Sequence, residues 1–463
     1  MMRAFSLAEA CQWASARCDQ DSLDDRQFTG VSTDSRSVRP GDLFVALRGD
    51  RFDGHRFLKG VEAAGAAAAV VDEAQPGVSL PQLVVDDTVD ALARLAAGHR
   101  RQSGARLMAV TGSSGKTTVR EMAAAILSEM GPTLATEGNL NNHIGVPLTL
   151  FRLAPEHRFG AIELGASGVG EIAHTVAITR PEVVMLTNAG QAHLERFGSY
   201  ENIVEAKGEI IEGVMDGGVV VLNRDDPAFD IWRQRAGERR VVSISQQGRK
   251  DADYRLLRAV DDHGQQRLTV AGPDGWQLEL SLPLPGVHNQ ANALMVIAAS
   301  RALGATDAQL QAGFARMQPV KGRLNRMVLS EHLTVIDDSY NANPASIKAA
   351  LAVLSGEPGQ TVAVLGAMAE LGPRARDYHR EVGACARELG IQRLLAVGAG
   401  AEGYADGFGP QTEIMTDHQA AVDAVLATPG ADMTVLVKGS RSSAMDRVVE
   451  GIQKKVTNAC CSG

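Results

Sequence analysis

The sequence predicts an α/β protein of three domains. Its 463 residues suffice for roughly three domains of about 150 residues each. From about residue 106 onward, apolar runs of strand length alternate with segments of helical periodicity, which is typical of a parallel sheet with helices on both faces. Polar residues directly follow several of these runs, at the strand ends where open sheets of this kind bind ligands. We place the domains at residues 1–104, 105–317 and 318–463.

Charge and composition exclude two classes of function. The net charge of −9 gives no basic footprint for nucleic acid. No apolar run approaches the roughly 20 residues of a membrane-spanning helix, and the N-terminus does not resemble a signal peptide, so we expect no membrane insertion. Five cysteines in no metal-binding spacing indicate a reducing compartment, and we expect a cytoplasmic protein. A monomer is the default expectation.

The first domain is predicted to be a mixed α/β unit. Ser6 and Glu9 have the spacing of a capping box for a short helix. Short strands are predicted at residues 28–31, 42–47, 67–71 and 82–85, followed by a helix at residues 88–101. Ser35 and Arg36 follow the first of these strands, and their simplest interpretation is turn chemistry beside a solvated charge.

The second domain opens with a strand at residues 107–110 and a helix whose apolar face runs from Val119 to Met130. The loop between them, Thr111-Gly-Ser-Ser-Gly-Lys-Thr-Thr118, is typical of phosphate binding. Backbone N–H groups and the helix N-terminus would face the anion, Lys116 adds a positive charge, and Thr117 offers a hydroxyl to Mg²⁺. The usual first glycine is missing. Further strands are predicted at residues 159–162, 183–186 and 219–222, with a β-rich excursion at residues 251–281 and a helix after Pro285.

The third domain again alternates strand and helix. Strands are predicted at residues 334–336, 361–365, 393–397 and 433–437. Pro344 is placed well as the first residue of a helix. A nucleotide site shared between this domain and the second would close on its ligand, so we expect hinges near residues 102–106 and 316–322.

Three residues of the second domain could extend the phosphate site. Glu163 ends a predicted strand, where it could hold Mg²⁺ beside Thr117 or simply be an exposed carboxylate. His193 could be a second metal ligand, although a lone histidine is more often a surface residue. Lys207 lies in an apolar-flanked stretch, and its default interpretation is a solvated helix charge with Glu205 and Glu209 as surface partners.

A regulatory GTPase is the alternative from another class, and the sequence disfavours it. Such a protein needs Asp-x-x-Gly at the γ-phosphate and Asn-Lys-x-Asp for guanine. Between Lys116 and Asn223 the sole aspartate is Asp216, which is followed by Gly-Gly-Val. The segment Asn223-Arg-Asp-Asp226 carries arginine in place of the lysine.

Together these stretches resemble the Mur ligases, the ATP-dependent amide-forming enzymes of peptidoglycan precursor assembly. The phosphate loop matches the family form, which lacks the first glycine. The family's other signature positions correspond to Glu163, His193, the segment His288-Asn-Gln-Ala-Asn292, Arg323 and Asp338. The resemblance spans residues 28–446 and implies a UDP-sugar-binding first domain, a central ATPase domain and a Rossmann-like third domain.

Within the family the sequence looks most like the branch that adds D-alanyl-D-alanine. The segments that carry this resemblance are residues 139–147, 163–167, 192–199 and, most specifically, Asp337-Asp-Ser-Tyr-Asn-Ala-Asn-Pro344. The alternative is a sister branch that adds a single amino acid, diaminopimelate or lysine, but its Asp-Asn-Pro-Arg signature for diaminopimelate is absent. Folylpolyglutamate synthase, a more distant relative, has no use for the N-terminal UDP-sugar motifs. A non-catalytic nucleotide-binding module would show no turnover.

The resemblance implies that ATP, Mg²⁺, UDP-N-acetylmuramoyl-tripeptide and D-alanyl-D-alanine meet in one site. It implies ATP contacts at Thr111, Gly112, Ser113, Ser114, Gly115, Lys116, Thr117, Thr118, Asn289, Asn292, Arg323 and Asp338. It implies metal ligation by Thr117, Glu163, His193 and a carbamylated Lys207, with Lys116, Glu163, His193 and Lys207 in catalytic roles. It implies UDP-sugar contacts at Ser35, Arg36, Asn139 and Asn142, and dipeptide contacts at Ser339, Asn341 and Asn343.

Overall fold

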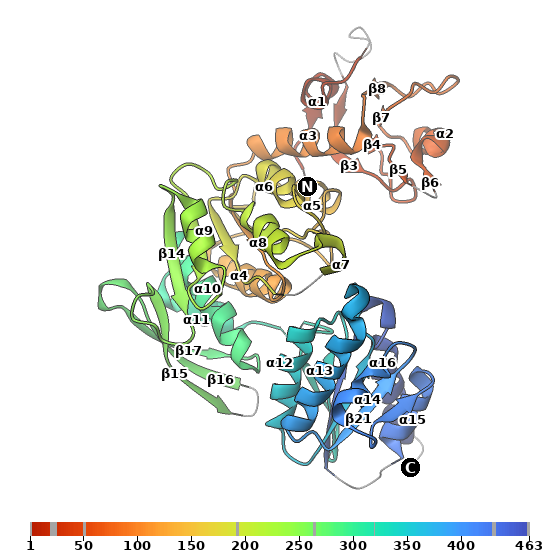
Figure 1. The fold of residues 1–463 in the computed structure, drawn as a ribbon. Coiled ribbons are helices and arrows are strands. Elements are labelled where there is room, and N and C mark those ends of the chain that lie inside the picture. Colours follow the sequence, from red (N-terminus) through yellow and green to blue (C-terminus); the bar gives the residue numbers. More distant parts are fainter. Residues whose placement is uncertain are drawn as a thin grey trace.

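A computed structural model shows three domains, each built on its own main sheet (Figure 1). The structure describes residues 2–18, 26–49, 52–190, 194–262, 265–318, 320–427 and 432–460. The expected α/β class with parallel sheets is confirmed. Among the helices of these residues, none has the length and apolar character needed to cross a bilayer.

The N-terminal domain has a four-stranded parallel sheet in the order β3-β4-β7-β8 and two small antiparallel pairs, β1-β2 and β5-β6. Its elements are β1 (Phe5–Ser6), α1 (Leu7–Ala14), β2 (Gln27–Phe28), β3 (Gly30–Ser32), β4 (Asp42–Val45), β5 (Arg48–Gly49), β6 (Phe52–Asp53), η2 (Gly54–Phe57), α2 (Leu58–Ala63), β7 (Ala68–Val71), β8 (Gln82–Val84) and α3 (Thr88–Arg101). The capping box of Ser6 and Glu9 is confirmed. The single strand predicted at residues 28–31 is wrong: it divides at Thr29, because β2 pairs with β1 and β3 pairs with β4.

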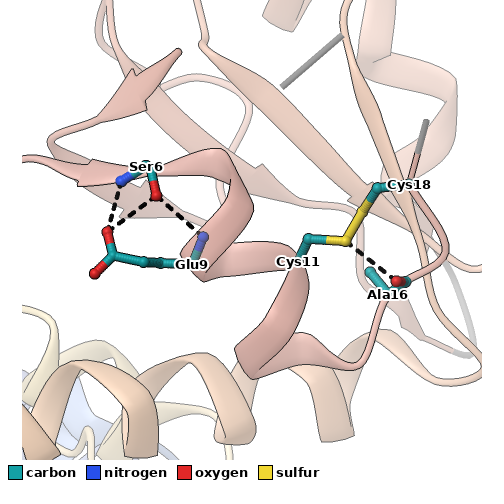
Figure 2. Close-up of a disulfide and its surroundings, with 5 residues drawn as sticks. All are labelled: Ser6, Glu9, Cys11, Ala16 and Cys18. Carbon is teal, nitrogen blue, oxygen red and sulfur yellow. Dashed lines mark hydrogen bonds between the residues drawn. A yellow bond between two sulfur atoms is a disulfide. The ribbon is translucent and has the colours of Figure 1, made fainter. Parts of the chain in front are cut away.

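Cys11 and Cys18 form a disulfide (Figure 2). Ser15 ends α1 in the left-handed region at φ 55°, so the chain turns back and brings Cys18 beside the helix. The backbone of Arg17 pairs with Val84, so the disulfide fastens α1 to the edge strand β8. Disulfides are rare where thiols are kept reduced, so the cysteines give no support to the expected reducing compartment.

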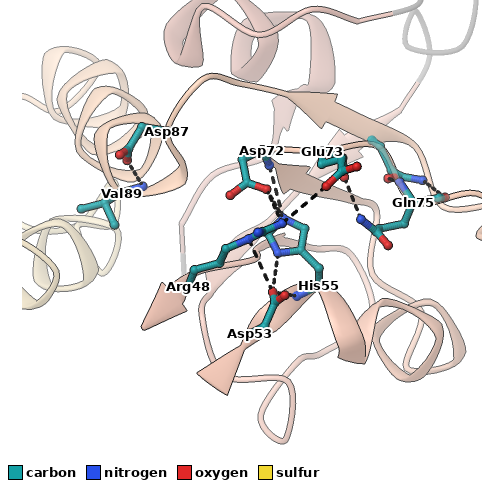
Figure 3. Close-up of polar contacts among 9 residues, drawn as sticks. Arg48, Asp53, His55, Asp72, Glu73, Gln75, Asp87 and Val89 are labelled. Atoms are coloured by element: carbon teal, nitrogen blue, oxygen red, sulfur yellow. Dashed lines mark hydrogen bonds and ion pairs between the residues drawn. The ribbon is translucent and has the colours of Figure 1, made fainter. Parts of the chain in front are cut away.

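A polar cluster joins the β5–β6 pair to the end of β7 (Figure 3). The His55 side chain is 3% exposed; its Nδ1 lies 2.7 Å from Asp53 Oδ1, and its Nε2 accepts from the backbone N–H of Asp72 at 3.3 Å. Arg48 pairs with the Asp72 carboxylate at 2.9 Å. These contacts fix the turn that leads into α2, which gives the cluster a structural role.

The central domain has a nine-stranded sheet in the order β10-β11-β9-β12-β13-β14-β15-β16-β17, parallel up to β15 and antiparallel beyond it. Its elements are β9 (Arg106–Thr111), α4 (Lys116–Met130), β10 (Thr133–Ala135), α5 (Gly145–Leu150), β11 (Phe159–Glu163), α6 (Glu171–Thr179), β12 (Val183–Leu186), α7 (Leu194–Phe197), α8 (Tyr200–Gly208), β13 (Val219–Asn223), α9 (Phe229–Ala236), β14 (Arg240–Ser245), β15 (Tyr254–Asp262), β16 (Gln265–Ala271), η3 (Pro273–Gly275), β17 (Gln277–Leu282), α10 (Val287–Ala302) and α11 (Asp307–Ala315). Because β9 lies between β11 and β12, the residues that follow these three strands meet at one edge.

The C-terminal domain has a six-stranded sheet in the order β18-β19-β23-β20-β21-β22, with β18 as its one antiparallel strand among the described residues. Its elements are β18 (Asn325–Ser330), β19 (Leu333–Asp338), α12 (Pro344–Ser355), β20 (Gln360–Gly366), η4 (Gly372–Arg374), α13 (Ala375–Glu388), β21 (Arg393–Val397), α14 (Gly403–Phe408), β22 (Glu413–Met415), α15 (His418–Leu426), β23 (Met433–Lys438), η5 (Arg441–Ser443) and α16 (Asp446–Cys460). Pro344 is the first residue of α12, as predicted.

The first two domains share a hydrophobic core, which runs from the N-terminal domain to one face of the central sheet. Helix α3 lies across α5 and α6 (Figure 1). His99 Nε2 donates to the Leu153 carbonyl at 3.0 Å, and the Arg100 guanidinium donates to the carbonyls of Thr179 and Arg180 at the end of α6. These contacts argue against a hinge at residues 102–106. The third domain instead has two hydrophobic clusters of its own.

His99 is expected to make stability depend on pH. Burial lowers its pKa to about 4, and its Nδ1 is buried without a hydrogen-bond partner. The unfolded chain takes up this proton near pH 6.5, so it binds more protons than the folded state between about pH 6.5 and 4, and stability falls as pH falls through that window. From pH 7.5 to 5 the loss from this residue is about 2 kcal/mol of unfolding free energy. Chemical denaturation at both pH values should show this loss in the wild type and not in His99→Gln, which can keep the bond to Leu153. An equal pH dependence in the two proteins would contradict the assignment.

Candidate active site

The loop before α4 wraps tightly because two of its residues are glycines. Gly112 has φ +149°, and a Cβ there would lie 1.9 Å from Thr187 Oγ1. Gly115 has φ +80°, and a Cβ there would lie 2.8 Å from Asn292 Oδ1. The backbone can follow this path only without side chains at these positions. It leads directly into the N-terminus of α4, where free N–H groups suit an anion.

The end of β12 holds the same loop in place. Thr187 Oγ1 donates to the Ser114 carbonyl at 2.6 Å. Asn188 accepts from the Ser114 backbone N–H through its side chain at 3.1 Å, and from the Ser113 N–H through its carbonyl at 3.0 Å. Thr111 is fully buried and donates to the Leu164 carbonyl, so its hydroxyl is used within the protein. Sequence reasoning noted Thr187 and Asn188 only as polar strand ends.

A cavity of about 600 Å³ lies between the phosphate loop and the third domain. The predicted site residues that line it are Ser113, Ser114, Gly115, Lys116, Thr117, Asn139, Asn142, Glu163, Arg323, Asn341 and Asn343. An adjoining cavity of about 320 Å³ is lined by the predicted residues Ser114, Gly115, Thr118, Asn289, Asn292, Arg323 and Asp338. Segments from two domains therefore meet around one opening.

The third domain reaches the phosphate loop through Arg323, whose Nη2 donates to Thr117 Oγ1 at 3.2 Å. Asp338 accepts from the Leu324 N–H at 3.1 Å and pairs with Lys438 Nζ at 2.5 Å. Lys438 ends β23 and lines both cavities, and burial lowers its pKa while Asp338 opposes the shift. Sequence reasoning missed Lys438, because its partner is 100 residues away.

The loop after β19 carries the three predicted dipeptide contacts. Asn341 and Asn343 line the larger cavity, and the Asn343 side chain also caps α12. Ser339 is buried, donates to Asp337 Oδ1 at 2.5 Å and does not line either cavity. Its hydroxyl is therefore committed to the carboxylate beside it.

Glu163 fits the expected role of a Mg²⁺ ligand. Its Oε1 accepts from Asn141 Nδ2 at 2.8 Å, whereas its Oε2 is buried without a hydrogen-bond partner, 3.9 Å from Arg120 Nε. A buried carboxylate oxygen left unpaired is costly, and a hard cation would satisfy it. Thr117 lines the same cavity, so the donor set of hydroxyl, carboxylate and substrate phosphates suits Mg²⁺.

His193, the expected second metal ligand, lies outside the described residues. Within the described ranges no three side chains of His, Cys, Asp or Glu cluster as a metal site.

Lys116 lies in the loop with its Nζ donating to the Gly112 carbonyl at 2.7 Å. Burial lowers its pKa, and Glu163 opposes the shift. The charge of the lysine is thus held between the loop and the carboxylate, where a phosphate could replace the carbonyl as its partner.

Lys207 is buried, so its default interpretation as a solvated charge is wrong. Its Nζ donates to the Ala166 carbonyl at 3.3 Å and lies 5.0 Å from the centre of the Phe197 ring. Burial, followed by the charge of Lys116, lowers its pKa to about 7. Glu209 is also buried and accepts from two N–H groups at the start of α6, so it is not the expected surface partner; Glu205 is exposed, but its partner is Arg235 of α9.

The predicted UDP-sugar residues are divided between two places. Asn139 and Asn142 line the larger cavity, and the Asn142 side chain accepts from the Gly145 N–H at 2.8 Å. Ser35 and Arg36 lie in a turn of the N-terminal domain and line neither cavity. Arg36 pairs with Asp34 at 2.7 Å and lowers the pKa of that carboxyl to about 2.

Two of the predicted ATP contacts, Asn289 and Asn292, lie at the start of α10. Asn289 donates to the Pro285 carbonyl at 2.7 Å, and Asn292 donates to Asn289 Oδ1 at 3.0 Å. Both line the smaller cavity. A phosphate loop completed by a second α/β domain across a cleft defines the class of protein, an enzyme that uses a nucleotide.

Comparisons with known proteins agree with this class. Family profiles match the Mur ligase family catalytic domain at residues 27–100, the Mur ligase middle domain at residues 110–300, and the Mur ligase glutamate ligase domain at residues 322–441. The chain is 44% identical over 440 residues to the UDP-N-acetylmuramoyl-tripeptide–D-alanyl-D-alanine ligase of Escherichia coli (strain K12). The aligned residues cover 94% of this chain and 95% of that ligase.

Solved structures show the same likeness. MurF from Acinetobacter baumannii matches with a TM-score of 0.92 and 33% identity, over 98% of this chain and 99% of that chain. MurF ligase from Thermotoga maritima in complex with ADP matches with a TM-score of 0.84 and 28% identity, over 93% of this chain and 98% of that chain. The chain belongs to the Mur ligase family of ATP-dependent ligases.

Proposed function

We propose that this chain joins D-alanyl-D-alanine to UDP-N-acetylmuramoyl-tripeptide and converts ATP to ADP and phosphate, a step of peptidoglycan precursor synthesis. The observation that carries the proposal is the larger cavity, because the phosphate loop and the loop of Asn341 and Asn343 line it together. The similarity to the Escherichia coli ligase over nearly the whole chain supports the same assignment. Because the reaction consumes ATP, we place it in the cytoplasm, and we propose a monomer.

The reaction needs two steps. The terminal carboxylate of the tripeptide attacks the γ-phosphorus of ATP, and the bond to ADP breaks, which gives an acyl phosphate. The free amine of the dipeptide then attacks the acyl carbon, loses a proton, and expels phosphate as the amide forms. Both steps bring anions together, so charge neutralisation and alignment contribute more than acid–base chemistry.

The nucleotide would lie across the two cavities. Lys116 and the loop N–H groups would hold the β- and γ-phosphates, and Arg323 would face the γ-phosphate from the third domain. Asp338 would bind the ribose, with Asn289 and Asn292 near adenine. Thr117 and Glu163 would hold Mg²⁺, which when bound neutralises phosphate charge.

We infer that Lys207 is carbamylated and, with His193, supports a second Mg²⁺. A carbamate forms when a neutral amine attacks CO₂ and releases a proton. Burial and a pKa of about 7 leave a large share of Lys207 neutral at physiological pH, which supports this step. The carbamate carries a negative charge, where the protonated amine of Lys207 would carry a positive one.

The UDP-sugar and the dipeptide would each contact the set of residues predicted for it. Asn139 and Asn142 would meet the UDP-sugar at the cavity, with Ser35 and Arg36 contributing from the N-terminal domain. Asn341 and Asn343 would face the dipeptide, with Ser339 shaping their loop through Asp337.

Phosphate release is the test of this function. With ATP, Mg²⁺ and UDP-N-acetylmuramoyl-tripeptide present, D-alanyl-D-alanine is expected to raise the rate by about tenfold or more over D-alanine, meso-diaminopimelate or L-lysine, because only the dipeptide fills the acceptor site. Reactions without tripeptide are the control. If UDP-muramoyl-dipeptide replaces the tripeptide and a single amino acid then stimulates phosphate release, the chain belongs to the sister branch instead. If no substrate stimulates phosphate release, the chain is a binding module.

A further inference from the structure

Tyr340 belongs to the loop of residues 339–343 after β19, called the acceptor loop below, and contacts Arg323, the arginine that reaches the phosphate loop. It is half-buried and lines the larger cavity. The guanidinium carbon of Arg323 lies 4.3 Å from the centre of its ring, and that of Arg441 lies 5.7 Å away. The Tyr340 ring therefore contacts the Arg323 guanidinium from within the third domain.

The backbone on both sides of Arg323 is fixed to the end of β19. Asp337 Oδ2 accepts from the Gly322 N–H at 3.0 Å, and Asp338 Oδ1 accepts from the Leu324 N–H at 3.1 Å. The N–H of Tyr340 donates to the Gly322 carbonyl at 3.2 Å. The segment of residues 322–324 and the acceptor loop are thus bonded into one unit.

Only the Arg323 side chain is left to be oriented. An arginine side chain has many rotamers, and a planar aromatic face restricts its planar guanidinium by stacking. The attractive contacts of this guanidinium include the ring contact and the bond to Thr117 Oγ1 at 3.2 Å, whereas the positive charges of Lys116 and Lys438 repel it.

We propose that Tyr340 is a positioning residue whose ring holds the Arg323 guanidinium against the phosphate loop, so that it meets the γ-phosphate of ATP. The proposal rests on the proposed function for the role of Arg323. It also links the two halves of the reaction, because Tyr340 sits between Ser339 and Asn341 in the acceptor loop.

Binding of nucleotides tests this without turnover. Calorimetry would compare ADP with an ATP analogue that carries an imido bridge between the β- and γ-phosphates. Tyr340→Leu should weaken the analogue roughly tenfold and change ADP by less than about twofold, whereas Tyr340→Phe should match the wild type because the ring remains. Tyr340→Met serves as a second aliphatic variant, with thermal unfolding to confirm the fold.

A double-mutant cycle separates positioning from other roles. If Tyr340 acts through Arg323, then adding Tyr340→Leu to Arg323→Ala should cause no further loss of analogue affinity. Additive losses, or wild-type affinity in both aliphatic variants, would overturn the proposal.

Turnover provides the matching kinetic result. In Tyr340→Leu, kcat should fall roughly tenfold while KM for the dipeptide stays within about twofold. A raised dipeptide KM with unchanged analogue affinity would show that Tyr340 instead contacts the acceptor, and would overturn the proposal. If the wild type shows no dipeptide-dependent turnover but the nucleotide pattern holds, the proposed function fails and the positioning role stands.

Discussion

Replacing Lys207 with alanine is expected to lower kcat on the order of a thousandfold, and added acetate or formate should restore part of the rate. The proposed carbamate supplies a negative charge to a metal that neutralises the reacting anions, and such a metal contributes several kcal/mol to the transition state. The alanine variant leaves a cavity beside Phe197 in which a small carboxylate can take the place of the carbamate. Phosphate release with increasing acetate measures both effects.

Two variants serve as controls for Lys207→Ala. Glu205→Ala lies on the same helix, and its exposed side chain pairs with Arg235, so its rate should stay within about twofold of the wild type. Lys207→Met should be inactive and insensitive to acetate, because its side chain fills the cavity. A fully active Lys207→Ala, or an inactive one that no carboxylate improves, would contradict carbamylation.

Replacing Glu163 with glutamine is expected to raise the Mg²⁺ concentration for half-maximal rate by about tenfold and to lower kcat on the order of a hundredfold. The orphaned Oε2 is the atom that the substitution neutralises, while the remaining amide oxygen can still accept from Asn141. The free energy of unfolding should fall, because the variant removes the negative charge that lies 3.9 Å from the buried Arg120 guanidinium. A Mg²⁺ titration of the initial rate measures the half-maximal Mg²⁺ concentration and kcat, and chemical denaturation measures the free energy of unfolding.

Glu121→Gln is the matched control for Glu163→Gln. Glu121 pairs with the same arginine, Arg120, but does not line the larger cavity. Its Mg²⁺ dependence should equal that of the wild type. The same result in Glu163→Gln would remove Glu163 from the metal site.

The sequence predicts the elements that local pattern determines. The strands Val183–Leu186 and Arg393–Val397 and the helix Thr88–Arg101 have the predicted bounds, because continuous apolar runs and clear caps specify them. The division at Thr29 and the Cys11–Cys18 pair were not predicted, since both depend on which distant segment each residue meets.

The same distinction applies to the site. The phosphate loop and Glu163 were predicted because strand, loop and helix follow one another in the chain, whereas Asp338 was predicted through the resemblance to the family. Lys438 and Tyr340 contact partners on other segments, Asp338 and Arg323, and no spacing in the sequence reveals these contacts. The roles of all the predicted site residues, including Ser35, Arg36 and His193, stay predictions.

The shared core of the first two domains has a consequence for how the reactants meet. His99 and Arg100 fix the first domain to the second, so the groups proposed to hold the UDP-sugar and the phosphates keep their mutual distances. The acceptor loop belongs to a domain with separate hydrophobic clusters. In the proposed reaction, the gap between carboxylate and amine then depends on the rigid-body position of the third domain, and movement of that domain changes the distance over which the new amide bond must form.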